Sequence, residues 1–447
     1  MTALAELRPY QLRPLAAVLS AVLRGRGGTF SVQIARQGGK NELSAHLELL
    51  VLAAFADRGG SIIKCAPTFH PQLRVSFLRL RDRCTALGLW PALLRAAGRR
   101  LEYGAASLTF LSAAPGAQVV GHTASLLLEC DEAQDVDPEK FDRDFRPMAA
   151  AANAVTVFYG VGGRRDSLLE RVKAETITHE RATGEQRHFS ATWREVARHV
   201  PAYGRYVESE RRRLGERHPL FLSQYCLVPF DGEGMLLDAA ALAALRGSHP
   251  RRRAPATGET YAAGLDLGGA GAGEHDRTAL AIGTARGGAV EVVELRTWQG
   301  RPYVALVDEL AALLRAWRVR RVAVDATGLG GPLADALGRA ARGTAVVPVA
   351  YTAARKSALG DGLLAAALGG RLRLFADDGS AESRALWHEL TRARAERGTA
   401  GRLAWGVPDR EGHDDLLHAL ALLVAAAGGV EPERRARGFV RGEPQRE

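Results

Sequence analysis

The stretch TFSVQIARQGGKNE, residues 29–42, decides the fold of the first half of this chain. Its first six residues are a mostly apolar run of the kind that forms a buried strand, and Gly38-Gly39-Lys40 follows shortly after. Glycines let a backbone approach an anion closely, the N–H groups at the start of a helix point toward that anion, and a lysine neutralises it. The stretch therefore predicts a phosphate-binding loop between a strand and a helix.

This loop departs from the usual GxxxxGK[ST] pattern at two positions. Ile34 stands where the first glycine is expected, and Asn41 replaces the Ser or Thr that binds magnesium. Arg36 lies inside the loop and could reach a γ-phosphate, while Tyr10 and Gln11 lie upstream, where an adenine could be stacked and read by an amide. The residues that we expect to bind the nucleotide are Gln11, Arg36, Gln37, Gly38, Gly39, Lys40 and Asn41.

A second motif, LLLECDEAQ at residues 126–134, supports the nucleotide interpretation. A buried strand would fix Asp131 at the sheet edge, where it can hold magnesium, and Glu132 can orient and deprotonate the attacking water. A lone Gly-Gly-Lys is usually an ordinary turn, and a strand followed by a helix-capping Asp is common. The two motifs together make nucleotide hydrolysis the better interpretation.

Composition narrows the class of protein. A chain of 447 residues, 47% hydrophobic and 25% charged, is expected to form two or three compact domains, and it has no apolar run long enough for a membrane span. Four cysteines without metal-ligand spacing favour a reducing cytoplasm. The net charge of +10 favours a polyanionic partner such as nucleic acid, although an arginine-rich coding bias would give the same charge.

The periodicity predicts an α/β protein with two domains. Residues 1–237 alternate strands and helices, as in an ATPase with a parallel sheet, with a helical segment from about residue 167. An Arg-, Pro- and Gly-rich stretch suggests a linker at residues 238–258. A second domain is expected at residues 259–429, and the charged tail at residues 430–447 is expected to be disordered.

Acidic residues recur at separate elements of the second domain. The order strand, hairpin, helix, strand and terminal acidic helix is typical of an RNase H-like nuclease. Such enzymes gather carboxylates on one sheet edge to hold two divalent ions, and oxygen ligands select magnesium or manganese. Each acid alone could be a turn residue or a helix cap. The candidate metal ligands are Asp266, Asp325, Asp414 and Asp415, with Asp276 in reserve, and His275, His413 and His418 could assist.

On these motifs the chain resembles the large terminase subunit of tailed bacteriophages, a DNA-packaging motor with an N-terminal ATPase and a C-terminal RNase H-like nuclease. The resemblance implies that residues 35–42 are the Walker A loop and that residues 127–134 are the Walker B strand with Glu132 as the catalytic glutamate. It places the coupling motif at Tyr159-Gly160. It also makes Asp266, Asp325 and the Asp414-Asp415 pair the metal ligands of the nuclease.

The resemblance further implies ATP, a magnesium ion at the ATPase site and two Mg²⁺ or Mn²⁺ ions at the nuclease site. It implies double-stranded viral DNA, a portal protein and a small terminase subunit as partners, with a homo-oligomeric ring during packaging, a monomer as an alternative in isolation, no membrane, and location in the host cytoplasm. Family members often carry an arginine finger just upstream of Walker B. Residues 119–125 contain no arginine here, so Arg143 or Arg146 would have to substitute.

Two other interpretations stay open on the sequence alone. One is another ATP-dependent helicase-nuclease, although the chain lacks a recognisable second motor domain. The other is a catalytically inactive, prophage-derived DNA-binding protein that keeps only the fold. The presence of all the expected acids weighs against the second.

Overall fold

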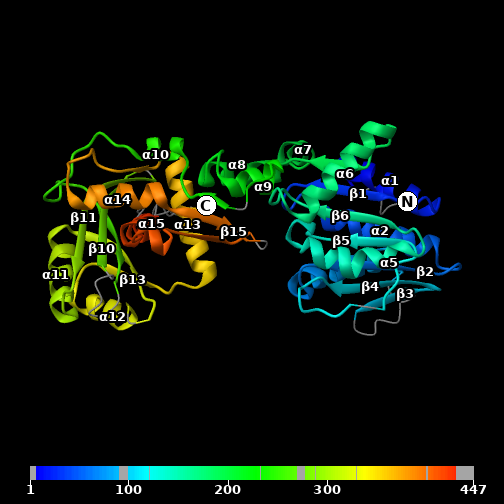
Figure 1. Ribbon diagram of the computed structural model, residues 1–447, viewed down its shortest axis with the longest axis horizontal. Helices are drawn as coiled ribbons and strands as arrows, with labels where there is room; N and C mark the ends of the chain where they lie inside the picture. The colour runs from blue at the N-terminus through cyan, green and yellow to red at the C-terminus, as the bar shows by residue number, and fades with distance from the viewer. Residues whose placement is uncertain are drawn as a thin grey trace, which may run out of the picture. The chain divides into compact units, whose positions relative to one another are not determined.

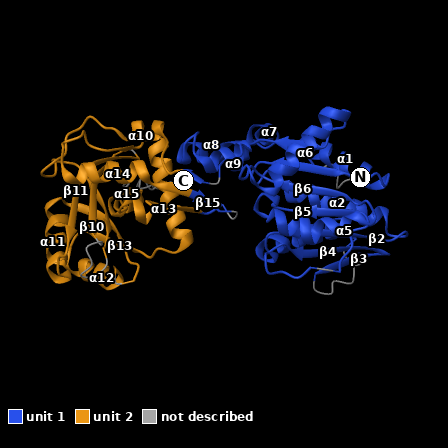
Figure 2. Ribbon diagram, viewed as in Figure 1, with its two compact units in different colours: residues 1–234, 396–402 blue, residues 235–395, 403–447 orange. Residues whose placement is uncertain are grey.

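The computed structural model describes residues 7–89, 99–119, 121–231, 233–268, 277–286, 288–328, 330–398 and 401–428. The chain divides into two compact units (Figure 2). Unit 1 comprises Met1–Gly234 with Glu396–Arg402, and unit 2 comprises Met235–Ala395 with Leu403–Glu447. The reserve ligand Asp276, the neighbouring His275 and the expected tail at 430–447 lie outside the described residues.

Unit 1 is built on a sheet whose described strands run in the order β3-β4-β2-β5-β6-β1-β7 (Figure 1). Neighbouring strands pair in parallel except β3 and β4, so the parallel sheet predicted from the sequence is confirmed. The strands are β1 (Thr29–Ile34), β2 (Gly60–Ala66), β3 (Arg100–Tyr103), β4 (Ala106–Ser112), β5 (Leu127–Cys130), β6 (Val155–Gly160) and β7 (His188–Ala191).

Helices on this sheet bury the apolar residues of its central strands on both faces, which is why those strands read as continuous apolar runs. One core cluster joins Leu128 of β5 and Phe158 of β6 to Phe141 and Phe145. The helices are α1 (Pro9–Leu23), α2 (Lys40–Ala54), α3 (Arg74–Ala86), α4 (Pro138–Lys140), α5 (Arg146–Ala150), α6 (Leu168–Thr183), α7 (Trp193–His199), α8 (Pro201–Leu214) and α9 (Pro219–Cys226).

Unit 2 contains a mixed sheet whose described strands run in the order β13-β12-β9-β10-β11-β14. Strands β9, β10 and β11 are antiparallel, whereas β12 is parallel to β9 and to β13, as expected of an RNase H-like fold. The strands that begin in or near this unit are β8 (Glu233–Met235), β9 (Tyr261–Asp266), β10 (Arg277–Arg286), β11 (Ala289–Gln299), β12 (Val319–Asp325), β13 (Ala345–Val349), β14 (Leu372–Arg373), β15 (Arg394–Arg397) and β16 (Leu403–Gly406).

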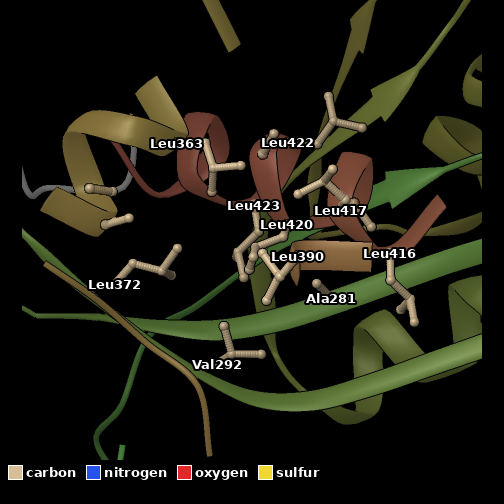
Figure 3. Close-up of a cluster of buried hydrophobic side chains, with 14 of the residues drawn as sticks. Ala281, Val292, Leu363, Leu372, Leu390, Leu416, Leu417, Leu420, Leu422 and Leu423 are labelled. Carbon is tan, nitrogen blue, oxygen red and sulfur yellow. The ribbon is translucent and has the colours of Figure 1, made fainter. Parts of the chain in front are cut away.

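Helix α15 (Asp415–Ala427) packs directly on this sheet, and it places the last two acids of the candidate site. Gly264 of β9 permits the close approach, because a Cβ there would lie 2.0 Å from the carbonyl oxygen of Ala419. Leu416, Leu420 and Leu423 of the helix enter the core beside Ala281 and Val292 (Figure 3). The other helices are α10 (Ala239–Leu245), α11 (Tyr303–Ala316), α12 (Gly330–Ala340), α13 (Ala353–Leu368) and α14 (Ala381–Arg392).

The stretch at 238–258 that the sequence suggested as a linker belongs to unit 2. Helix α10 lies within it and buries Leu245 completely in the unit 2 core, and Arg251 makes an ion pair with the buried Glu294. Arg251 and Arg252 of this stretch therefore contact β11 of the unit 2 sheet, through Glu294 and the carbonyl of Val293. None of the described helices is long and apolar enough to cross a membrane.

Candidate nucleotide and metal sites

The phosphate loop joins the end of β1 to the start of α2. Gly39 adopts a left-handed conformation with φ of +96°, which L side chains rarely accept. A Cβ at Gly39 would also lie 2.5 Å from the side-chain nitrogen of Gln11. Local geometry therefore requires a glycine directly before Lys40.

Residues outside the loop hold its backbone in place. Tyr10 donates its hydroxyl to the carbonyl of Gly38 at 2.7 Å, and Gln11 Nε2 donates to the carbonyl of Gly39 at 2.8 Å. The other end of the Gln11 amide accepts a hydrogen bond from the backbone N–H of Arg8, and the side chain is fully buried. Gln11 therefore stabilises the backbone of the phosphate loop through its hydrogen bonds, whereas the sequence suggested that it would contact an adenine.

Lys40 brings the two nucleotide motifs together. Its Nζ lies 2.8 Å from Glu132 Oε1 and 3.6 Å from Asp131 Oδ1. Burial alone would lower the pKa of Lys40, but the charges of Glu132 and Asp131 outweigh it and raise that pKa. The predicted lysine and both predicted acids therefore meet at the carboxyl ends of β1 and β5.

A cavity of about 1010 Å³ opens at this point. Asp131, Gly38, Arg143 and Arg146 are not among the residues that line it, and the last two are largely exposed and paired with Asp144 and Asp142. The cavity is also lined by arginines that the sequence did not single out, namely Arg8, Arg79, Arg164, Arg213 and Arg397. The predicted residues that line it are Arg36, Gln37, Gly39, Lys40, Asn41 and Glu132.

Gln134 and Asp135 line the same cavity and were missed by the sequence reasoning. Gln134 Nε2 donates to Glu132 Oε2 at 2.8 Å and to Asp135 Oδ2 at 3.1 Å, and its Oε1 accepts from the N–H of Val161 at 3.4 Å. A Cβ at Gly160 would lie 2.1 Å from that Oε1, so a glycine is needed at the end of β6. Burial, followed by the charge of Glu132, raises the pKa of Asp135 to about 7.

A buried polar network lies beneath the loop. Lys64 of β2 donates to Glu48 Oε1 at 2.7 Å and to the hydroxyl of Ser44 at 2.6 Å, both on α2. Tyr159 of β6 and Ser44 both donate to Glu129 Oε1, at 2.9 Å and 3.1 Å. Burial and then the neighbouring Glu48 raise the pKa of Glu129 well above its usual value. The network joins α2, β2, β5 and β6, and its only signal in the sequence is that Glu129, two residues before Asp131, points to the same sheet face.

The acids of unit 2 converge at one edge of its sheet. Asp266 is the last residue of β9 and Asp325 the last of β12, and these strands pair in parallel with Val324 opposite Leu265. Asp414 and Asp415 begin α15, which lies on β9. The structure therefore brings together all four of these predicted acids, although they come from three distant segments.

The negative charges of these acids affect one another. Burial raises the pKa of Asp266 well above its usual value, and the charges of Asp415, Asp325 and Asp414 raise it further. Asp325 accepts hydrogen bonds from the N–H and hydroxyl of Thr327, at 2.8 Å and 2.6 Å. A divalent cation would relieve the mutual repulsion, and the all-oxygen donor set suits magnesium or manganese.

The acids of this cluster lie near one another, but they do not form a complete set of metal ligands by themselves. Across the described segments, no three His, Cys, Asp or Glu side chains are arranged as a ready metal cage. Magnesium usually keeps several waters and takes one or two carboxylates together with substrate phosphate oxygens. The arrangement therefore fits a site whose coordination is completed by water and by a phosphodiester.

Side chains that the sequence did not single out as ligands surround Asp414. His418 Nε2 lies 3.2 Å from Asp414 Oδ2, and this contact holds the pKa of Asp414 below its usual value although burial opposes it. The rings of Trp405 and Tyr351 pack against His418, with centroids 4.5 Å and 5.4 Å away. Glu389 of α14 is also buried here, and burial together with Asp415 and Asp414 raises its pKa to about 8.

Comparisons with known proteins agree with this geometry. Residues 263–427 match the family model described as the terminase RNaseH-like domain. The large terminase of the thermophilic bacteriophage D6E has a similar structure, with 13% identity and a TM-score of 0.56 over 93% of this chain and 98% of that chain. The same terminase in complex with ADP, and in complex with ATP-gamma-S, gives a TM-score of 0.53, 13% identity and coverage of 94% and 98%. Comparison with curated protein sequences gave no match.

Unit 1 therefore has an α/β fold built on a largely parallel sheet and unit 2 has an RNase H-like fold, as in the large terminase of D6E. Residues 263–427 are similar to the terminase RNaseH-like domain, and the chain as a whole has the fold of a phage large terminase. The predicted resemblance and the predicted fold class are confirmed.

Proposed function

We propose that this chain is a DNA-packaging motor subunit that hydrolyses ATP in unit 1 and cuts DNA with divalent ions in unit 2. One observation carries the proposal, namely that each unit gathers its own set of predicted charged residues at one sheet edge. Lys40 meets Asp131 and Glu132 in unit 1, and four acids meet at the ends of β9 and β12 in unit 2. The binding of ATP-gamma-S by the D6E terminase supports ATP as the nucleotide.

In unit 1, Lys40 and Arg36 would bind the phosphates, with Gln37, Gly38, Gly39 and Asn41 contributing loop groups. Lys40 now pairs with Glu132, and a γ-phosphate would compete for that lysine. Glu132 would then be available to take a proton from the attacking water, while Gln134 keeps its carboxylate oriented. Asp131 would hold the magnesium that accompanies ATP.

In unit 2, Asp266, Asp325, Asp414 and Asp415 would hold two divalent ions. When bound, such a pair would activate water and stabilise the leaving oxygen of a phosphodiester. The His418 side chain, on α15, contacts the Asp414 carboxylate. The Thr327 hydroxyl donates a hydrogen bond to the Asp325 carboxylate and holds it in place. We assign magnesium or manganese to these ions because every donor is a hard oxygen.

Double-stranded viral DNA is the proposed substrate, and the net charge of +10 suits a polyanion. The proposed protein partners are a portal protein and a small terminase subunit. Copies of this chain would form a homo-oligomeric ring during packaging, in the cytoplasm of the host. The family match of unit 2 supports these assignments.

The two activities can be separated by substitution. Glu132→Gln should lower ATP turnover by roughly 10²–10⁴-fold because it removes the general base, and should leave metal-dependent plasmid cleavage unchanged. Asp325→Ala should do the reverse. Phosphate release and plasmid cleavage with Mg²⁺ or Mn²⁺ are the measurements, and Glu139→Gln, at an exposed glutamate, is the control.

Other results would reject the proposal. Loss of both activities in either folded variant would argue against separate sites. Absence of cleavage with both metals in the wild-type chain would favour a DNA-binding protein that keeps only the fold, and ATP-driven strand separation would favour a helicase-nuclease.

A further inference from the structure

The start of α15 is capped by another helix. Asp414 occupies the N-cap position, where an aspartate side chain ordinarily accepts the N–H of the second or third helical residue. Its side chain makes no such capping bond. The N–H of Leu417, the third helical residue, instead donates to Glu389 Oε2 at 2.8 Å, and Glu389 belongs to α14.

The Asp414 carboxylate is held in a different direction. Its Oδ2 accepts from the N–H of Val407 at 3.3 Å and contacts His418 Nε2 at 3.2 Å. A Cβ at Gly406 would lie 2.6 Å from the same oxygen, so the backbone before Val407 passes unusually close. A carboxylate that capped its own helix could not also make these contacts from the same position.

Glu389 is rigidly placed for its role. The residue is 5% exposed, and its neighbours Leu386 and Leu390 on α14 are buried in the unit 2 core. A carboxylate at a helix N-terminus is also favoured by the helix dipole. Glu389 also lies beside the acidic cluster, because its charge contributes to the raised pKa of Asp266 and the charges of Asp415 and Asp414 contribute to its own raised pKa.

We propose that Glu389 is a positioning residue that caps α15 in place of Asp414, so that Asp414 and Asp415 are oriented toward the divalent ions. The inference rests on the proposed nuclease site. Glu389 acts here through its hydrogen bond to the helix, and neither through its charge nor as a ligand.

Three substitutions separate these roles. Glu389→Gln keeps an acceptor at the same reach and removes the charge, Glu389→Asp keeps the charge and shortens the reach, and Glu389→Ala removes both. Binding of Mn²⁺ to the full chain, without DNA or nucleotide, is measured by titration calorimetry. If Glu389 is a cap, the Gln variant stays close to the wild type, and the Asp and Ala variants lose roughly 10–100-fold in affinity.

The kinetic readout follows from the same argument. Plasmid cleavage at saturating Mn²⁺ should largely recover in the Ala variant, because the lost orientation weakens binding of the ions more than it changes the acids themselves. Glu294→Gln, which disturbs another buried carboxylate of unit 2, should leave Mn²⁺ affinity unchanged. This control separates capping from a general loss of stability.

Several outcomes would overturn the inference. Wild-type affinity in the Ala variant would show that the cap is not needed. Retained affinity in the Asp variant with loss in the Gln variant would show that the charge matters. Equal loss in all three variants would show that neither the acceptor of the Gln variant nor the charge of the Asp variant is sufficient, and would also contradict capping. Failure of the nuclease proposal looks different, because the wild-type chain would then show no Mn²⁺ binding that Asp325→Ala removes.

Discussion

Lys40 and Lys64 are both buried beside carboxylates, yet their surroundings indicate different roles for the two lysines. Lys64 lies between Glu48 and Ser44, is 1% exposed and is not among the residues that line the cavity beside Lys40. Lys40 faces the cavity, and its partner Glu132 is held from the other side by Gln134. A buried charge needs a partner at all times, and only Lys40 is placed to exchange a carboxylate for a phosphate.

Asp135 should make the stability of unit 1 depend on pH. Its pKa is raised to about 7 in the folded chain, against about 3.9 when unfolded. Between these values the folded state binds more protons than the unfolded state, so the free energy of unfolding falls as the pH rises from about 4 to about 7. Asp135→Asn should therefore be more stable than the wild type at pH 8, by on the order of 1 kcal/mol.

That difference should shrink toward zero below about pH 3, where the wild-type carboxyl is protonated in both the folded and the unfolded state. Urea unfolding of both chains across this range is the measurement. Asp57→Asn, at an exposed position, controls for the loss of one negative charge. A stability difference that stays the same at every pH would contradict the prediction.

At the level of elements, periodicity predicted most of the strands and helices because it depends on local sequence. The strand at residues 29–34 is observed with the same bounds, and the predicted hairpin appears as β10 and β11. The stretch at 238–258 was misread because α10 is short and lies next to an arginine-rich loop. Glu389 could not be predicted, since its partner Leu417 lies 28 residues away and their contact depends on how α14 packs on α15.

The packing of α15 on β9 gives a prediction for Gly264. A Cβ there would lie 2.0 Å from Ala419 O and 2.2 Å from Leu423 N, and both are backbone atoms of a buried helix. Gly264→Ala should therefore destabilise unit 2 by about 1–3 kcal/mol, in urea unfolding followed by tryptophan fluorescence. It should also lower Mn²⁺ affinity, because the shifted helix carries Asp414 and Asp415.

Gly362 offers a matched control for this substitution. It lies within α13, and a Cβ there would meet no atom within 4 Å. Gly362→Ala should be neutral or stabilising by roughly 0.5–1 kcal/mol, since alanine loses less backbone entropy in a helix. Equal effects of the two substitutions would show that α15 can move away from β9 at little cost.

At the level of the whole molecule, each unit has its own hydrophobic core and its own candidate site. One cluster lies in unit 1 around Phe141 and Phe158, and another lies in unit 2 around Leu417 and Leu420. The sequence predicted both sites because their charged residues sit at strand ends, which a pattern can locate. It did not predict the residues that orient them, such as Gln134 and Glu389, because these act through contacts between elements.

Separate cores and sites mean that each ligand should stabilise its own unit. A ligand present at 100 times its dissociation constant stabilises the folded state by about 2.7 kcal/mol, and for units of this size each kcal/mol raises the unfolding temperature by about 2–4 °C. ATP-gamma-S with magnesium should therefore raise the transition of unit 1, and Mn²⁺ that of unit 2, in calorimetric scans of the full chain. Lys40→Met should abolish the first shift alone and Asp325→Ala the second alone. If either variant removed both shifts while both transitions persisted, the two sites would be thermodynamically coupled and the assignment of one ligand to each unit would be wrong.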